Sequence, residues 1–192
     1  MDNFELEFTP FPTFYSNRLK LRKLSVSDAA DMFEYSSRPN VSEYENWKPH
    51  KSVAETRDFL KWARRQYFKK KFFSWAIVLN SGKMIGTVSF VKIDCDNRSA
   101  EIGYTVSEEY WGNGYAKEAV YQLLRFGFSN LGLNRIYAKV IKGNTRSVRV
   151  LEKLGFIYEG TARKANFYQN VCSDLMYFSI LSDEFLNIYK KD

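Results

Sequence analysis

Apolar and polar positions follow two different rhythms along the chain, and each rhythm predicts a different kind of element. Residues 18–24 alternate with a period of two, which is typical of a half-buried strand. Residues 115–131 instead repeat apolar side chains every three or four positions, which predicts a helix with one buried stripe. The chain therefore combines strands and helices.

Capping and turn residues divide the rest of the chain into further elements. Ser52 precedes a helix with Glu55 at the capping-box spacing, whereas Gly155 is placed to end a later helix. Pro39 is expected to stop the first helix, which leaves residues 40–51 as a loop. The predicted helices span residues 28–38, 53–70, 115–131 and 144–154. The predicted strands span residues 18–24, 72–79, 84–93, 100–106, 135–141, 156–164 and 171–181.

The order of these elements limits the fold class. Three strands follow one another in the middle of the chain, which argues against a doubly wound parallel sheet. With 192 residues the chain is long enough to bury one full core. Hydrophobic residues make up 45% and charged residues 27%, which is typical of a globular protein and not of a disordered one. The pattern predicts a single mixed α/β domain.

Features that direct a protein to a membrane or out of the cell are missing from the sequence. No apolar run approaches the roughly 20 residues that span a bilayer. The first residues are acidic and aromatic, unlike a signal peptide. Cys95 and Cys172 form neither a disulfide framework nor a metal-ligand pattern. We therefore expect a cytoplasmic protein with no metal site and no membrane partner.

The net charge of +7 suits an anionic partner such as nucleic acid, an acidic protein or a polyphosphate cofactor. The densest basic run is residues 69–71, shortly after Arg64 and Arg65. Such a run is typical of the last turn of a helix, where cations complement the dipole, and no RNA-binding motif accompanies it. We therefore predict no direct nucleic-acid binding.

Gly112 and Gly114 stand between a predicted strand and the most strongly periodic helix. Glycine permits close approach of a ligand to the backbone, and a helix N-terminus offers unpaired N–H groups and a partial positive charge. Together these features can bind phosphate or pyrophosphate, although a tight structural turn would use the same two glycines. Neither a P-loop motif nor a complete dinucleotide-binding motif is present.

Five segments follow one another along the chain: Ser16-Asn17-Arg18-Leu19-Lys20-Leu21-Arg22, Met84-Ile85-Gly86, Ala100-Glu101-Ile102-Gly103-Tyr104, Tyr110 to Ala119, and Asn144-Thr145-Arg146-Ser147 with Leu154-Gly155-Phe156. Taken in this order, they resemble the GNAT superfamily of N-acetyltransferases, and within it the ribosomal-protein acetyltransferases typified by RimJ and RimL. The resemblance covers about residues 11–181.

The resemblance implies a fold and its limits. It implies an α/β (α+β) domain over residues 11–182, with a mixed, mostly antiparallel central sheet that is splayed at the cofactor site and flanked by helices on both faces. Residues 1–10 are then an N-terminal extension, and residues 183–192 a short C-terminal helix or tail. The oligomeric state is left as monomer or homodimer.

The resemblance also implies a binding site for acetyl-CoA. The superfamily signature Q/R-x-x-G-x-G/A begins here at Trp111, where this branch commonly departs from Gln or Arg. The implied pyrophosphate-binding residues are Trp111, Gly112, Asn113, Gly114, Tyr115, Ala116 and Lys117. The backbone of Tyr104, Thr105 and Val106 is expected to pair with the pantetheine arm in the manner of strand addition.

Three residues are candidates for catalysis. Asn144 and Ser147 have the spacing of a helix cap, and the resemblance adds a cofactor contact for Asn144 and protonation of the leaving thiolate by Ser147. Glu101 is the candidate base for the acceptor amine; a residue that orients the amine, or a partner of a nearby arginine, are the alternatives.

The predicted function is transfer of an acetyl group from acetyl-CoA to a primary amine, by direct attack in a ternary complex. The branch analogy favours a protein N-terminal amine, such as that of a ribosomal protein. A small amine (a polyamine, an amino acid or an antibiotic) and a non-catalytic acyl-CoA-binding module are the alternatives. Residues 40–51 and 165–170 are expected to shape the acceptor cleft.

Overall fold

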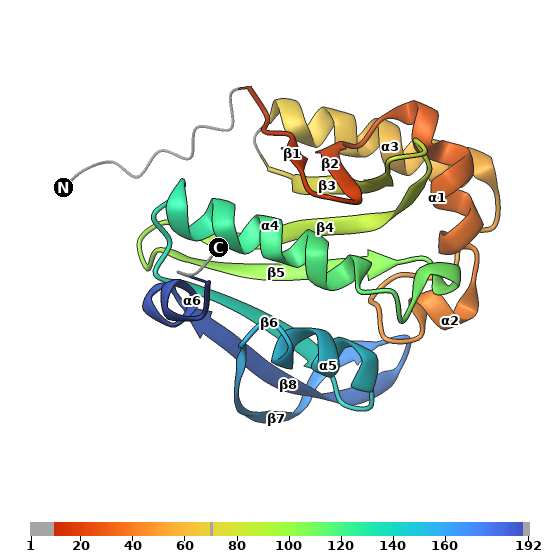
Figure 1. Ribbon diagram of the computed structural model, residues 1–192. Helices are drawn as coiled ribbons and strands as arrows, with labels where there is room; N and C mark the ends of the chain where they lie inside the picture. Colours follow the sequence, from red (N-terminus) through yellow and green to blue (C-terminus); the bar gives the residue numbers. More distant parts are fainter. Residues whose placement is uncertain (1–9, 70, 190–192) are drawn as a thin grey trace.

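The computed structural model describes residues 10–69 and 71–189 and contains one eight-stranded sheet with the order β1-β2-β3-β4-β5-β6-β8-β7 (Figure 1). The strands are β1 (Phe14–Tyr15), β2 (Leu19–Lys23), β3 (Phe73–Leu79), β4 (Met84–Asp94), β5 (Ser99–Val106), β6 (Arg135–Ile141), β7 (Ile157–Tyr168) and β8 (Val171–Leu181). The helices are α1 (Ala29–Ser36), α2 (Pro39–Ser42), α3 (Val53–Phe68), α4 (Tyr115–Ser129), α5 (Thr145–Glu152) and α6 (Ser182–Tyr189), with the 3-10 turns η1 (Val26–Asp28) and η2 (Glu108–Tyr110).

Both faces of the sheet are covered, because successive side chains of a strand point to opposite faces. In β3, Trp75 and Ile77 join the core that packs under α4, whereas Ala76 and Val78 join the core under α1 and α3. Figure 1 shows α4 crossing one face of the sheet. The predicted mixed sheet with helices on both faces is therefore confirmed.

The sheet splits between β5 and β6. Among the strand pairs that the structure describes, this one alone is parallel, and it holds only from Ser99 to Glu101. Beyond Glu101, β5 stays paired with β4 as far as Val106, while β6 follows β8 as far as Ile141. The two strands diverge, as predicted, and leave a gap lined by backbone groups.

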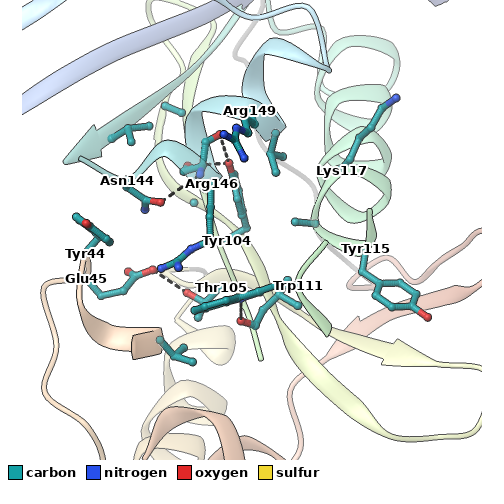
Figure 2. Close-up of a pocket in the computed structure, with 18 of the residues that line it drawn as sticks. Tyr44, Glu45, Tyr104, Thr105, Trp111, Tyr115, Lys117, Asn144, Arg146 and Arg149 are labelled. Atoms are coloured by element: carbon teal, nitrogen blue, oxygen red, sulfur yellow. Dashed lines mark hydrogen bonds between the residues drawn. The ribbon is translucent and has the colours of Figure 1, made fainter. Parts of the chain in front are cut away.

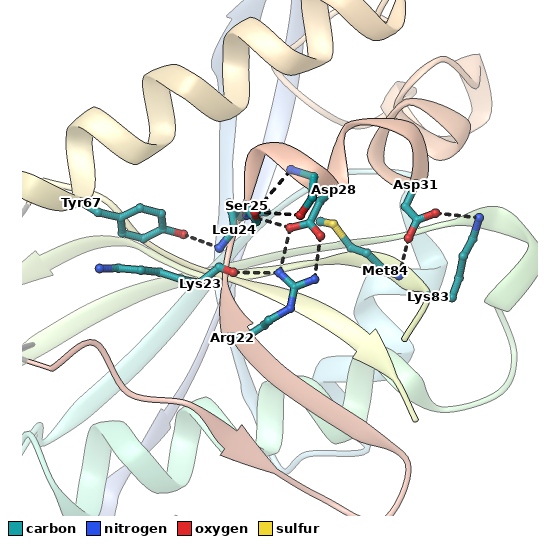
Figure 3. A network of polar contacts seen from close by, with 10 residues as sticks. Arg22, Lys23, Leu24, Ser25, Asp28, Asp31, Tyr67, Lys83 and Met84 are labelled. Carbon is teal, nitrogen blue, oxygen red and sulfur yellow. Dashed lines mark hydrogen bonds and ion pairs between the residues drawn. The ribbon is translucent and has the colours of Figure 1, made fainter. Parts of the chain in front are cut away.

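The connection from β2 to α1 is fixed by buried polar contacts (Figure 3). Ser25 and Asp28 form a reciprocal capping box around η1. Arg22 at the end of β2 donates two hydrogen bonds to the Asp28 carboxylate, at 2.8 and 2.6 Å. Tyr67 of α3 accepts a hydrogen bond from the Leu24 N–H and donates one to a β3 carbonyl. These contacts fix the start of α1. The chain then continues through α2 to residues 40–45, which reach the gap between β5 and β6.

Several predicted boundaries differ from the structure. Pro39 ends no helix but begins α2, where its fixed φ suits the first helical position, so residues 40–51 are not entirely loop. β7 continues four residues past the predicted 164 because it bulges near Lys164, which has a φ of +51°, and then pairs again with β8. β1 was not predicted, since its two residues carry no periodicity.

Part of the chain lies outside the described residues. The expected N-terminal extension, residues 1–10, falls there except for Pro10, as do Lys70 in the basic run and residues 190–192 of the expected C-terminal segment. The rest of that segment belongs to α6. No helix in the described ranges is long and apolar enough to cross a membrane.

Candidate active site

A pocket of about 680 Å³ opens where β5 and β6 diverge (Figure 2). Its walls come from the end of β5, the glycine turn, the start of α4, β6, α5 and residues 40–45. Of the residues predicted for the site, it brings together Tyr104, Thr105, Val106, Trp111, Gly112, Gly114, Tyr115, Ala116, Lys117, Asn144 and Ser147. Asn113 and Glu101 do not line it.

The glycine turn has the geometry of an anion cradle. Gly112 and Gly114 have φ values of +79° and +80°, which side chains with a Cβ rarely adopt. A Cβ added to Gly112 would meet no atom within 4 Å, and Gly112 lines the pocket, so there is open space beside this part of the turn. Gly114 caps α4, and its carbonyl accepts the first helical hydrogen bond, from Glu118. The preceding N–H groups of the first turn have no partner within the helix.

Side-chain hydrogen bonds outside the pocket hold the glycine turn in place. Arg18 at the start of β2 donates to the Glu118 carboxylate at 2.7 Å and to the Asn113 carbonyl at 3.0 Å. The Asn113 side chain donates to the Trp111 carbonyl at 3.0 Å, so this side chain shapes the turn; Asn113 is not among the residues that line the pocket. The segment around Arg18, which is the first of the five in the resemblance, therefore stabilises the glycine turn, which belongs to the fourth.

The backbone of β5 presents groups to the gap at alternate residues. The Thr105 carbonyl faces β4, since a Cβ on Gly86 of that strand would lie 2.2 Å from it. The N–H and C=O groups of Tyr104 and Val106 consequently face the gap, and the Trp111 indole donates to the Val106 carbonyl at 2.7 Å. Of the three residues predicted to pair with pantetheine, Thr105 contributes its side chain rather than its backbone.

Ser147 and Asn144 lie together at the start of α5. The Asn144 side chain caps the helix by accepting a hydrogen bond from the Ser147 N–H at 3.1 Å. The Ser147 hydroxyl shares a hydrogen bond of 2.8 Å with the Tyr104 hydroxyl. Burial raises the pKa of Tyr104 above its ordinary value, so this hydroxyl keeps its proton at neutral pH. Tyr104 was predicted only for its backbone; no sequence pattern signals its hydroxyl.

Glu101 lies at the end of β5 that is paired with β6, and it is not among the residues that line the pocket. Its carboxylate forms an ion pair of 2.7 Å with Lys139 of β6, and this hydrogen bond raises the pKa of Lys139. The structure does not bring Glu101 to the other predicted catalytic residues. It matches the predicted alternative of a cationic partner, except that the partner is a lysine.

Glu45 is the carboxylate that the pocket does contain, and sequence reasoning missed it. It follows α2 and accepts a hydrogen bond of 3.0 Å from the Thr105 hydroxyl (Figure 2). Burial raises its pKa to about 7, against the lowering effect of hydrogen bonds from Thr105 and Trp47. Glu45 stands in an aperiodic polar stretch with no motif around it, so no sequence signal marks it.

The charge of the pocket suits a polyanionic ligand. Glu45 is the one acidic residue among the described residues that line the pocket. The five basic ones are Lys117, Lys139, Arg146, Arg149 and Lys153. Together with the open cradle at Gly112, these cations fit the phosphates of acetyl-CoA, and the gap along β5 fits an extended amide-bearing arm. In the described residues no group of three or more potential ligands could hold a metal ion.

Comparison with known proteins agrees with this geometry. The family model described as an acetyltransferase (GNAT) domain matches residues 18–157. The uncharacterized N-acetyltransferase p20 of Bacillus licheniformis is 37% identical over 174 residues, which are 90% of this chain and 98% of p20. Spermidine N(1)-acetyltransferase of Vibrio cholerae is 26% identical over 173 residues, which are 90% of this chain and 98% of that enzyme.

A solved structure shares the fold as well. Ribosomal-protein-S5-alanine acetyltransferase from Vibrio fischeri superposes with a TM-score of 0.77 at 27% identity, covering 91% of this chain and 98% of that one. The chain belongs to the GNAT acetyltransferases. It is an N-acetyltransferase that uses acetyl-CoA as its acetyl donor.

Proposed function

We propose that the protein acetylates a primary amine that carries a single positive charge, and that this amine is the N-terminus of a protein or peptide. The observation that carries the proposal is the charge of the pocket, where Glu45 stands alone among five basic residues. One carboxylate can pair with one ammonium group, whereas the further charges of a polyamine would find no second carboxylate among the described residues that line the pocket.

The ionisation of the acceptor points the same way. An α-amino group has an ordinary pKa of about 8, whereas a side-chain or polyamine ammonium lies near 10. Burial brings the pKa of Glu45 to about 7, so a proton passes to it more readily from an α-amino group. Among the relatives, one solved structure is named for an alanine of a ribosomal protein, which is consistent with such an acceptor.

Direct attack of the amine on the thioester accounts for the remaining groups. In the proposed mechanism the Val106 N–H donates to the thioester carbonyl and stabilises the oxyanion. In the same mechanism Ser147, which shares a hydrogen bond of 2.8 Å with the Tyr104 hydroxyl, protonates the leaving thiolate, and Asn144 fixes Ser147 by capping α5. Neither Cys95 nor Cys172 is among the described residues that line the pocket, so an acyl-cysteine route has no nucleophile there.

The test compares acceptors of matched size. Acetyl-CoA would be incubated with peptides that have a free N-terminus, with the same peptides blocked at the N-terminus but carrying an internal lysine, and with spermidine and free amino acids. Thiol release and product mass would be followed. We expect kcat/KM for free N-termini to exceed that for the blocked peptides and spermidine by at least about tenfold, a difference of 1.4 kcal/mol.

Two other results would overturn parts of this proposal. Preferred turnover of spermidine would mean that its charges are compensated outside the pocket, and the substrate class would then be a polyamine, as in the Vibrio cholerae relative. Tight acetyl-CoA binding with no turnover of any acceptor would leave a non-catalytic acyl-CoA-binding module.

A further inference from the structure

Residues 43–46 cross the side of the pocket proposed for the acceptor, and they contact three other parts of the molecule. Glu43 forms an ion pair of 3.7 Å with Arg146 of α5. The Tyr44 ring packs against Gly143, where an added Cβ would lie 3.4 Å from it. Glu45 accepts a hydrogen bond from Thr105 of β5, and the Asn46 side chain donates to Asn166 of β7 at 3.1 Å. We call residues 43–46 the bridging segment.

The contacts on either side of Glu45 restrict where its carboxylate can lie. One carboxylate oxygen accepts a hydrogen bond from the Thr105 hydroxyl. Thr105 precedes Val106, whose backbone N–H faces the gap. Tyr44 and Glu43 hold the segment against α5 and the turn before it, so Glu45 is directed inward rather than to solvent (Figure 2). The geometry places a carboxylate beside the stretch of β5 at which the thioester is expected.

On this geometry, and resting on the proposed acetyltransfer to an amine, we propose that Glu45 is the catalytic base that removes the proton from the acceptor. Glu101, the base suggested by the sequence, is engaged by Lys139 and lies outside the pocket. Both carboxylates lie on the same face of β5: Glu101 is on the strand itself, and Glu45 is hydrogen-bonded to Thr105, four residues further along. They differ in that Glu45 reaches the pocket and Glu101 does not.

The electrostatic surroundings of Glu45 support this role. Burial is the main cause of its raised pKa of about 7, and a base with a pKa near the working pH is the most effective. Tyr35 of α1 and Tyr104 of β5 face it as neutral hydroxyls whose own pKa values are raised by burial. Trp47 donates a hydrogen bond to it.

Charged groups around Glu45 come from three directions. Arg146 of α5 and Lys139 of β6 line the same pocket, and Glu43 precedes Glu45 in the bridging segment. Arg146 is paired with Glu43 and stacked over the Trp111 ring at 3.9 Å. Within residues 10–69 and 71–189, no ion pair includes the Glu45 carboxylate. Glu45 is therefore free to exchange a proton near neutral pH.

The acceptor ammonium group loses two protons during the reaction, one to Glu45 and one to the leaving sulfur. Glu45 accepts one proton from the acceptor ammonium group and releases it to solvent. The nitrogen lone pair then forms the N–C bond to the thioester carbonyl carbon, and the C–S bond breaks. Ser147 donates a proton to the departing sulfur and regains one, through Tyr104 or water, from the nitrogen, which has become an amide. The sum is an N-acetylated amine, a free thiol and one proton.

The experiment measures kcat against pH at saturating acceptor, because that profile reports the groups of the substrate complex. The native protein should gain activity as pH rises through about 7, since deprotonated Glu45 is the active form. Glu45→Gln should lower kcat by roughly 10²-fold and remove this rise, while acetyl-CoA affinity measured by calorimetry stays within about twofold.

Two further variants make the test specific. Thr105→Val removes the hydroxyl that stabilises the ionised carboxylate, so the rise in activity should move to higher pH by about one unit. Glu101→Gln is the matched control, because it removes the other carboxylate on this face of β5. This variant should keep the rise of kcat near pH 7. Unchanged acetyl-CoA affinity in each variant shows that the site has folded.

The outcomes separate this proposal from the function on which it rests. If the native protein acetylates amines and Glu45→Gln keeps both its rate and its pH profile, Glu45 is not the base. Loss of the pH-dependent rise in Glu101→Gln, but not in Glu45→Gln, would assign the role to Glu101 instead. Absence of turnover by the native protein would overturn the proposed acetyltransfer and, with it, the base.

Discussion

The two halves of the pocket are built in different ways. The donor half is formed by short runs of consecutive residues, namely the glycine turn with the start of α4, and Asn144 with Ser147 at the start of α5. The acceptor half is formed by the bridging segment, residues 43–46, which contacts three separate parts of the chain: residues 143–146, β5 and β7. One half therefore depends on local backbone geometry and the other on contacts distant in sequence.

This difference has a consequence for what each half can tolerate. Backbone N–H groups bind phosphate whatever the side chains are, so the donor half is sensitive chiefly to changes of backbone conformation or to a Cβ in the cradle. The acceptor half binds through a side chain whose pKa depends on its burial, so it is sensitive to the loss of single polar atoms. The following substitutions test that contrast.

The largest effect on acetyl-CoA binding is expected from Gly112→Ala. The new methyl group enters the space in which the pyrophosphate would lie, so acetyl-CoA should bind at least about tenfold more weakly by calorimetry. Gly82→Ala is the matched control, because Gly82 also has a positive φ, of +91°, and open space at its Cβ, but lies in the β3–β4 turn. Equal weakening by both variants would mean that backbone strain, and not the cradle, is responsible.

Removal of the hydroxyl pair should have a somewhat smaller effect, on turnover alone. Tyr104→Phe and Ser147→Ala should each lower kcat by about tenfold near pH 7 with little change in acetyl-CoA affinity, because the leaving thiolate loses its proton donor. The deficit should shrink above pH 8.5, the ordinary pKa of a thiol, where the thiolate leaves without a proton. A deficit that is constant from pH 6 to 9 would contradict donation by this pair.

Glu45→Gln should change stability as well as activity, with a defined dependence on pH. The folded-state pKa of Glu45 is raised from 4.5 to about 7, so the folded protein binds more protons than the unfolded chain between these values. Stability contributed by protonated Glu45 is then lost as pH rises from 4.5 through 7. Relative to the native protein, the Tm of Glu45→Gln should rise across this interval, by roughly 7–14 °C at pH 8. A Tm difference that does not vary with pH would contradict the raised pKa.

The smallest effect is expected from the outer end of the bridging segment. Asn46→Ala and Asn166→Ala each remove one exposed hydrogen bond, so each should raise the acceptor KM by about twofold and leave acetyl-CoA affinity unchanged. The double variant should be no worse than either single one, because both remove the same contact. Additive losses would show that the two side chains act separately.

Much of the fold and of the donor half could be predicted from the sequence. Hydrophobic period, caps and turns are local properties, and they placed β6, β8 and the start of α4 where the structure has them. The turn at Gly112 and Gly114 could also be predicted from the sequence, because its backbone conformation requires glycine. The boundary errors lie where tertiary contacts override local signals, as in β7, which resumes pairing beyond a bulge.

Only the tertiary structure decided which carboxylate faces the acceptor. Glu101 stands inside a recognisable motif, yet Lys139, 38 residues away, engages it. Glu45 stands in no motif, yet the fold brings it to Thr105, 60 residues away, and buries it there. Burial and hydrogen bonding from distant residues set the pKa of a carboxylate, and a local sequence pattern contains neither. The sequence by itself therefore determined the acetyl donor, and tertiary structure determined the group that meets the acceptor.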